Sequence, residues 1–290
     1  MNNDNFTLDI TVPPADYVEN IIDIDSFKIL DNIENVKLLE KQIAYLRTSY
    51  SGSILFRGLA DNKFKLTPSI IYNSSHKEGN ICTGYYNILK KALQKLKVFG
   101  IQNEWNKYKL KKEDEELFYL SIGRHLGLNC QIMDWTSNFC TALSFAICDE
   151  NKKEKNGSLW ILFSDSNTKC ISPFSVHDDS IQIIKESFLL PKNDSFNNLP
   201  KGILRRSRQN GYFTIVAEKN INKPIHILSN KDKSIHFYKI EISHELKKEL
   251  YDKLINIYKS FILTEDNFHN ELYNFIKELN REIDNDINQL

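Results

Sequence analysis

Apolar residues recur at helical spacing in several stretches of this chain. The first stretch places its apolar side chains on one face of an N-terminal helix, at Ile29, Ile33, Val36, Leu39, Ile43 and Leu46. The same periodicity runs through residues 85–100, 113–126, 245–260 and 265–279, where charged residues fill the intervening positions. This pattern predicts amphipathic helices that cover a sheet.

Shorter apolar runs indicate strands between these helices. Residues 53–57 form a short run with an apolar centre and Gly58 follows, which predicts a buried strand that ends at a turn with Arg57 at its end. Residues 159–163, 213–217 and 235–242 are rich in β-forming residues. The combined order of helices and strands predicts an α+β fold.

Polar segments divide the chain. Residues 1–25 are polar, with Pro13 and Pro14 breaking regular structure, and residues 164–201 read as a long connection interrupted by an apolar run around 181–190. The acidic tail from Asn280 is expected to fray. We therefore predict an N-terminal helical extension over 1–50, a main domain over 51–280 and a C-terminal tail over 281–290.

Composition adds few functional clues. A 41% hydrophobic share and 11% aromatic residues suit a globular core, and 38 basic residues balance 38 acidic ones, which removes a global charge argument for nucleic acid or an acidic membrane. Five cysteines without a CxxC pair predict reduced thiols. Without a secretory signal or a membrane-span pattern, the expected location is cytoplasmic.

The richest stretch is 124–147, which reads RHLGLNCQIMDWTSNFCTALSFAI. It sets polar and aromatic side chains on a short turn that leads into an apolar segment, namely His125, Asp134, Trp135 and Thr136. With the earlier triplet Phe56-Arg57-Gly58, this stretch resembles the FRG family of bacterial proteins, which is named for that triplet.

The resemblance runs from about residue 54 to residue 279. Its central and later matches are His125, Gly127, Leu128, Asp134, Trp135, Thr136, Arg205, Gln209, Gly211 and Phe213. The chain departs from the family at Arg124, where Gln is usual, and at 129–131, where Pro-Thr-Arg is usual. The role of that family arginine is therefore not carried over to this chain.

A more distant resemblance is to ADP-ribosyltransferase folds. These have a first strand ending in Arg-Gly, a Ser/Thr strand and then a helix with Ala-x-x-Phe-Ala, which Ala142, Phe145 and Ala146 follow after Thr136. The resemblance implies a central β-sheet flanked by helices and an NAD site.

Such enzymes also use a Glu on a later strand, before a Gly-x-Phe segment, to polarise a ribose hydroxyl of NAD. Residues 205–209 stand there in this chain without a Glu. Glu218 and Glu241 are weak substitutes, and Asp134 is the better candidate because it belongs to the motif.

An NAD site explains the choice of candidate residues. A guanidinium binds phosphate or ribose oxygens bidentately, a hydroxyl orients the ribose, and a carboxylate stabilises the charge that develops as nicotinamide leaves. The catalytic candidates are Arg57, His125, Asp134, Thr136 and Gln209. The cofactor-binding candidates are Arg57, Gly58, Trp135 and Arg205, and no metal ligands are expected.

Each candidate also has a structural interpretation. Arg57 can be a buried partner of Asp134, and His125 can be a core imidazole instead of a general base. Asp134 can cap the helix over 139–147, with Thr136 or Ser137 as the immediate N-cap. For Trp135, core packing is favoured over stacking on a ligand.

The basic cluster before the predicted strand at 213–217 contains both functional candidates and residues with a structural interpretation. Arg205 and Gln209 are retained as candidates because they match the family pattern, whereas Arg206 and Arg208 read as a solvated turn.

The leading functional hypothesis is an enzyme that binds NAD or a related nucleotide and transfers ADP-ribose or cleaves NAD. Family analogy suggests a bacterial toxin or antiviral defence effector, with a protein or nucleic acid as acceptor and no membrane partner. The alternative is a catalytically inactive module that binds nucleotide, RNA or protein. P-loop, Rossmann, zinc-protease and α/β-hydrolase motifs are absent from the sequence, which lowers support for those mechanisms.

Overall fold

The computed structural model describes residues 28–70, 85–102, 112–164, 181–185, 211–228, 235–262 and 267–287. Its strands are β1 (Ile29–Leu30), β2 (Ser53–Leu59), β3 (Ile132–Thr136), β4 (Gly157–Ser164), β5 (Gln182–Lys185), β6 (Gly211–Ile215) and β7 (Ile235–Ile242). Its α-helices are α2 (Ile33–Ser49), α4 (Tyr85–Gln102), α5 (Lys112–His125), α6 (Phe139–Ile147), α8 (Ile225–Leu228), α9 (His244–Ile262) and α10 (Asn267–Ile287). Two 3-10 turns are η3 (Glu150–Lys152) and η6 (Glu218–Asn220).

The seven strands form one mixed sheet in the order β1-β7-β4-β2-β3-β6-β5. β1 pairs parallel with β7, and the other neighbouring strands pair antiparallel. This sheet and its flanking helices confirm the predicted α+β class.

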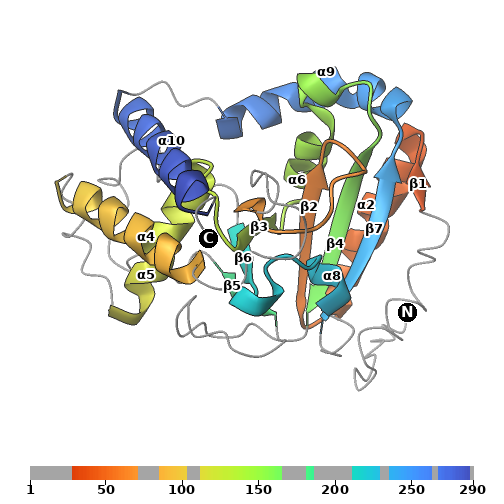
Figure 1. The fold of residues 1–290 in the computed structure, drawn as a ribbon. Coiled ribbons are helices and arrows are strands. Elements are labelled where there is room, and N and C mark those ends of the chain that lie inside the picture. The colour runs from red at the N-terminus through yellow and green to blue at the C-terminus, as the bar shows by residue number, and fades with distance from the viewer. Residues whose placement is uncertain are drawn as a thin grey trace, which may run out of the picture.

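The helices lie in two groups (Figure 1). α4, α5 and α10 gather at the end of the sheet that carries β3, β6 and β5, whereas α2, α6 and α9 lie beside β2, β4 and β7. Each group has its own apolar core, and a third core lies on the face that α8 covers. Between the two helical groups lies the boundary of β2 with β3.

The N-terminal helix shows how local sequence sets its limits. The Asn32 side chain accepts a hydrogen bond from the backbone N–H of Asn35 at 2.9 Å and caps α2, because its oxygen satisfies an end group that lacks a helical partner. The inner face buries the expected apolar residues Val36, Leu39, Ile43 and Leu46. These side chains share a core with β2 and α6, while the division into domains stays a prediction.

Four predictions about where elements lie or end were wrong. Ile29 lies on β1 instead of α2, and β2 continues through Gly58 to Leu59 instead of ending at a turn. Asp134 lies on a strand, β3, instead of a short turn. The tail expected to fray from Asn280 is helical to Ile287, because α10 keeps burying apolar residues at helical spacing to its end.

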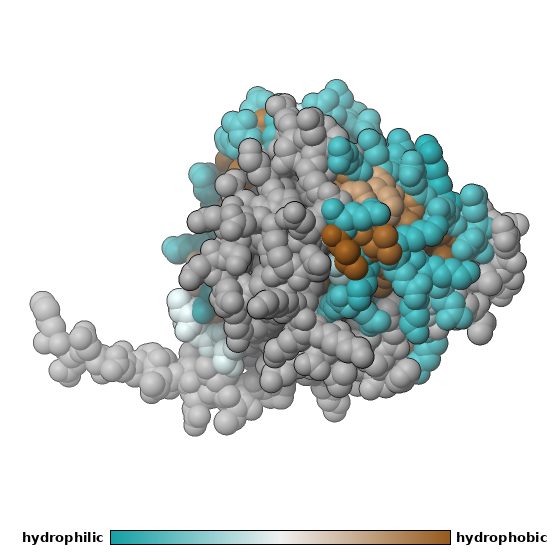
Figure 2. Space-filling view, turned by 90° about the vertical axis from the view of Figure 1, so that its left-hand side faces the viewer, coloured by the Kyte–Doolittle hydropathy of each residue, from teal (hydrophilic) through white to brown (hydrophobic). Residues whose placement is uncertain are grey.

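One face of the molecule leaves apolar side chains open to solvent. Figure 2 shows a group of hydrophobic atoms surrounded by hydrophilic residues on the face that forms the left-hand side of Figure 1. Val98 and Ile101 of α4 are among the exposed large hydrophobic residues. Within the described ranges, no helix is long and apolar enough to cross a membrane.

Candidate functional site

The candidate site lies where the sheet opens between β2 and β3. β2 pairs with β4 over its whole length, from Ser53 to Leu59, but its register with β3 consists of the single pair Phe56–Thr136. A cavity of about 340 Å³ lies beside this pair. Its walls come from β2, β3, α6 and the end of α5, with Phe56, Arg57, Gly58, Arg124, Gly127, Asp134, Trp135, Thr136, Thr141, Ala142 and Phe145 as lining residues.

Asp134 holds two arginines in this cavity. Arg124 Nε lies 2.7 Å from Oδ1 of Asp134, and Arg124 Nη2 lies 3.2 Å from Oδ2, which is a bidentate pair. Arg57 Nη1 donates to the backbone oxygen of Asp134 at 2.5 Å and lies 3.4 Å from Oδ2. The ion pair that the sequence suggested between Arg57 and Asp134 is thus present, with Arg124 as a second cation.

Within the described residues, this cluster brings two guanidinium groups to one carboxylate. Burial opposes the charge of Arg124, but the neighbouring Asp134 outweighs it and raises the pKa of Arg124 above its usual value. The arginine side chains are 15% and 14% exposed for Arg57 and Arg124, so both retain some access to the cavity.

Cys130 lies next to this cluster and is fully buried. Burial raises the pKa of its thiol to about 12, although the positive charge of Arg124 acts in the opposite direction. The thiol is therefore neutral at pH 7 and adds no negative charge beside Asp134.

The β3 residues after Asp134 have defined partners. Trp135 is 3% exposed, packs in the core and donates from Nε1 to the Thr214 hydroxyl at 3.0 Å. Thr136 accepts a hydrogen bond from the backbone N–H of Asn138 at 3.0 Å. Trp135 therefore borders the cavity as part of the packed interior, and its part in ligand binding stays a prediction.

The cap of α6 differs from expectation. Asn138 is the N-cap, and its side chain accepts from the backbone N–H of Thr141 at 3.1 Å. The expectation that Thr136 or Ser137 is the N-cap was wrong. The Thr136 hydroxyl instead accepts a hydrogen bond from the backbone N–H of the N-cap residue, Asn138. Asp134 points its carboxylate at the arginines.

Gly58 has a packing role in the cavity wall. A Cβ atom at this position would lie 1.8 Å from the backbone oxygen of Ala142 and 2.7 Å from the backbone nitrogen of Ala146. α6 therefore approaches β2 directly over Gly58. The glycine of the triplet allows the helix to form one wall of the cavity.

Other candidates lie elsewhere or outside the described residues. Arg205 and Gln209 are outside the described ranges, and His125 ends α5 with a side chain that is not described. Glu241 lies on β7, does not line the cavity and accepts from Asn156 Nδ2 at 2.6 Å. The side chain of Glu218 is not described, although its backbone begins η6.

Sequence reasoning missed Arg124 as a site residue. It treated this arginine as a departure from the family, yet the structure places it on both oxygens of Asp134. The available signal was its position in the last turn of an amphipathic helix, directly before the motif. No group of three or more metal-ligating side chains occurs in the described part of the chain.

Residues 52–155 match the FRG domain family, so the chain contains an FRG domain. The match covers β2, β3 and α6, which supply most of the cavity wall. Comparisons with curated proteins and with solved structures found no match.

Proposed function

We propose that this FRG-domain protein binds a nucleotide that carries a diphosphate, with NAD as the first ligand to test. The supporting observation is the convergence of the Arg57 and Arg124 guanidinium groups on Asp134 in the wall of a cavity. Guanidinium groups bind phosphate oxygens through parallel hydrogen bonds. A cavity of about 340 Å³ is within the size range of small-molecule sites.

We further propose that the bound NAD is cleaved or serves as donor of ADP-ribose, as the likeness to ADP-ribosyltransferase folds suggests. The bond between nicotinamide nitrogen and ribose C1′ would break, and its electron pair would leave with nicotinamide. Asp134 would stabilise the positive charge that develops on the ribose. An oxygen of water or of an acceptor would then bond to C1′ and release its proton to solvent.

A second function has its own support. Arg124 holds both carboxylate oxygens of Asp134, and no other carboxylate lines the described cavity. An arrangement of this kind suits a module that binds nucleotide without turnover. A protein or nucleic-acid acceptor and a role as bacterial toxin or antiviral effector extend the enzymatic proposal by family analogy.

The test combines NAD binding with nicotinamide release. Purified full-length protein is titrated with NAD by calorimetry, and nicotinamide is followed by chromatography with and without cell lysate. Arg57→Gln should weaken NAD binding by about 10-fold or more, because it removes a charge-assisted hydrogen bond. Arg281→Gln, an exposed change on α10, is the matched control and should bind normally.

Asp134→Asn separates the two functions, provided that its thermal melting shows a folded protein. If this variant binds NAD but no longer releases nicotinamide, the result supports the enzymatic function. Binding without release in the wild-type protein supports the binding module. No binding of NAD or ADP by the wild-type protein would overturn both.

A further inference from the structure

A second cavity lies on the other side of the Phe56–Thr136 pair. It encloses about 170 Å³ and is lined by Arg47, Tyr50, Gly52, Ser53, Ile54, Leu55, Ser137 and Tyr212. Its β2 residues precede Phe56, whereas Arg57 and Gly58 of the first cavity follow it. We call this second cavity the Arg47 pocket.

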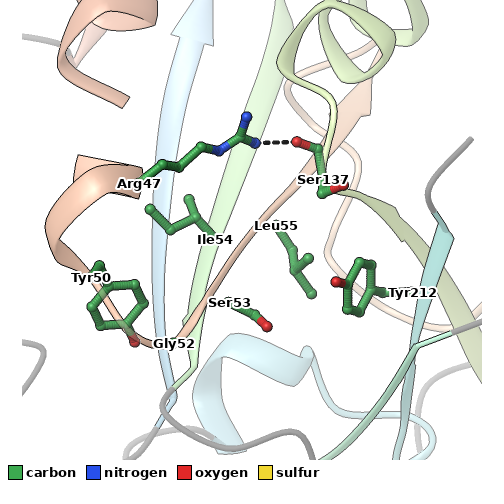
Figure 3. A pocket seen from close by; sticks show the side chains of 8 residues that line it. All are labelled: Arg47, Tyr50, Gly52, Ser53, Ile54, Leu55, Ser137 and Tyr212. Carbon is green, nitrogen blue, oxygen red and sulfur yellow. Dashed lines mark hydrogen bonds between the residues drawn. The ribbon is translucent and has the colours of Figure 1, made fainter. Parts of the chain in front are cut away.

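Arg47 extends across this pocket from the end of α2 (Figure 3). Its Nη2 donates a hydrogen bond to the backbone oxygen of Ser137, and its guanidinium lies over the Phe56 ring, 5.4 Å from the ring centroid. A cation over an aromatic face is attracted to it. These two contacts orient the guanidinium before any ligand arrives.

The charge of Arg47 has no carboxylate partner among the described residues. No Asp or Glu lines the pocket, and the hydrogen bond to Ser137 uses one of about five guanidinium donors. Partial burial lowers the pKa of Arg47, and the electrostatic interaction with Tyr212 acts to raise it. An arginine stays protonated at neutral pH despite such a shift.

Hydroxyl groups lie around the same space. Figure 3 shows Ser53 on β2 and Tyr212 on β6 on the side of the pocket away from the Arg47 guanidinium. A hydroxyl can donate to an anionic oxygen. The pocket is about half the volume of the first cavity, so it suits a single anionic group better than a nucleotide.

We propose that the Arg47 pocket is an oxyanion site that binds a phosphate or carboxylate group. Arg47 supplies the positive charge and the N–H donors that the bond to Ser137 leaves, and Ser53 and Tyr212 place hydroxyls in the opposite wall of the pocket. The site is separate from the cavity at Asp134 and does not depend on NAD binding there.

The test titrates the full-length protein with inorganic phosphate and, separately, with acetate, while NMR follows the arginine Nε–Hε resonances. Arg47→Gln should weaken phosphate binding at this site by about 10-fold or more, because a charge-assisted pair is lost. Tyr212→Phe keeps the ring and should weaken it by about 2- to 10-fold through the loss of one neutral hydrogen bond. Arg57→Gln, in the other cavity, should leave it unchanged.

The two anions distinguish the ligand class. Tighter binding of phosphate identifies a phosphate group as the natural ligand, and tighter binding of acetate identifies a carboxylate. Thermal melting checks that each variant is folded. If Arg47→Gln is unfolded, Arg47→Lys takes its place. It keeps the positive charge without the planar guanidinium, and its loss of phosphate affinity should be intermediate. Unchanged affinity in folded Arg47 and Tyr212 variants, or no saturable binding of either anion, would overturn the proposal.

Discussion

The two cavities beside the Phe56–Thr136 pair differ in how they handle positive charge. In the first, Arg57 and Arg124 are largely buried and share the carboxylate of Asp134. In the second, Arg47 is exposed at the pocket mouth and meets a backbone oxygen and an aromatic ring. Buried charges need partners, whereas exposed ones are stabilised by water.

This difference teaches what each arginine does in the free protein. Arg124 supports the fold through Asp134, so its contribution to ligand binding comes with a structural one. Arg47 contributes little to the fold and keeps its charge available. Substitution of an arginine should therefore affect stability more in the first cavity than in the second.

The largest effect should come from the glycines of the two walls. Gly58→Ala should lower the free energy of unfolding by about 3 kcal/mol or more, because its Cβ would meet a backbone oxygen of α6 at 1.8 Å. Gly52→Ala, in the Arg47 pocket, should cost about 2 kcal/mol, since its Cβ would lie 2.3 Å from the Ser164 oxygen. Urea denaturation measures both.

Gly127→Ala is the control for these glycines. The Cβ of the alanine would lie in open space, but the φ of +91° at this position favours glycine. A loss of about 1 kcal/mol is therefore expected from backbone strain alone. Equal losses at Gly58 and Gly127 would show that α6 does not pack tightly on β2.

Asp134→Ala should produce the next largest loss. It leaves two guanidinium groups without their carboxylate, which costs about 3–5 kcal/mol for a fully buried pair. Because the Asp134 side chain is 37% exposed, solvent screening reduces our expectation to about 2 kcal/mol. Chemical denaturation of both proteins at pH 7 measures the difference. A stability equal to wild type would show that the ion pairs of Asp134 with the two arginines do not stabilise the fold.

A matched pair of arginine substitutions compares the cavities directly. Arg124→Gln removes the bidentate pair and should destabilise the protein by about 1–2 kcal/mol. Arg47→Gln should cost less than about 1 kcal/mol, because the side chain is exposed and has one backbone hydrogen bond and one ring contact. Thermal and urea unfolding give the ranking, and the reverse order would contradict our comparison.

The smallest effect at neutral pH concerns the ionisation of Cys130 beside the first cavity. Its pKa of about 12 in the folded protein lies above the ordinary value of 9.0, so the folded state favours the thiol. The resulting stability is complete below pH 9 and is lost as pH rises from about 9 toward about 12. Cys130→Ala should flatten this part of the stability profile, as measured by urea unfolding between pH 7 and pH 10.5. An unchanged profile would show that folding does not raise the pKa of the Cys130 thiol.

Much of the secondary structure could be predicted locally. The helix at α2 and the strand at β7 follow from periodicity and β-forming residues, because each pattern reflects one buried face of its own element. β3 was missed because Ile132–Thr136 is short and mixes polar with apolar residues. A buried partner strand on each side, and not its composition alone, makes it a strand.

The candidate site divides in the same way. The triplet at Phe56-Arg57-Gly58 and the motif residues Asp134 and Thr136 were recognisable in the sequence and lie together in the structure. Arg124 was not recognisable, because its partner depends on how α5 is placed against β3. Gly58 was taken as a cofactor contact, and its close approach to α6 could not be seen without the packing.

The amino-acid sequence by itself determined the α+β class, the buried faces of the helices and the FRG motif, because these depend on residue types at short spacing. The tertiary structure alone decided that β2 and β3 meet at one residue pair, with a cavity on each side. It also decided that Asp134 pairs with Arg57 and Arg124 but not with Arg47. The physical reason is that ion pairing requires a few ångströms of separation, and distances between residues far apart in the chain are set by the packing of the sheet and its helices.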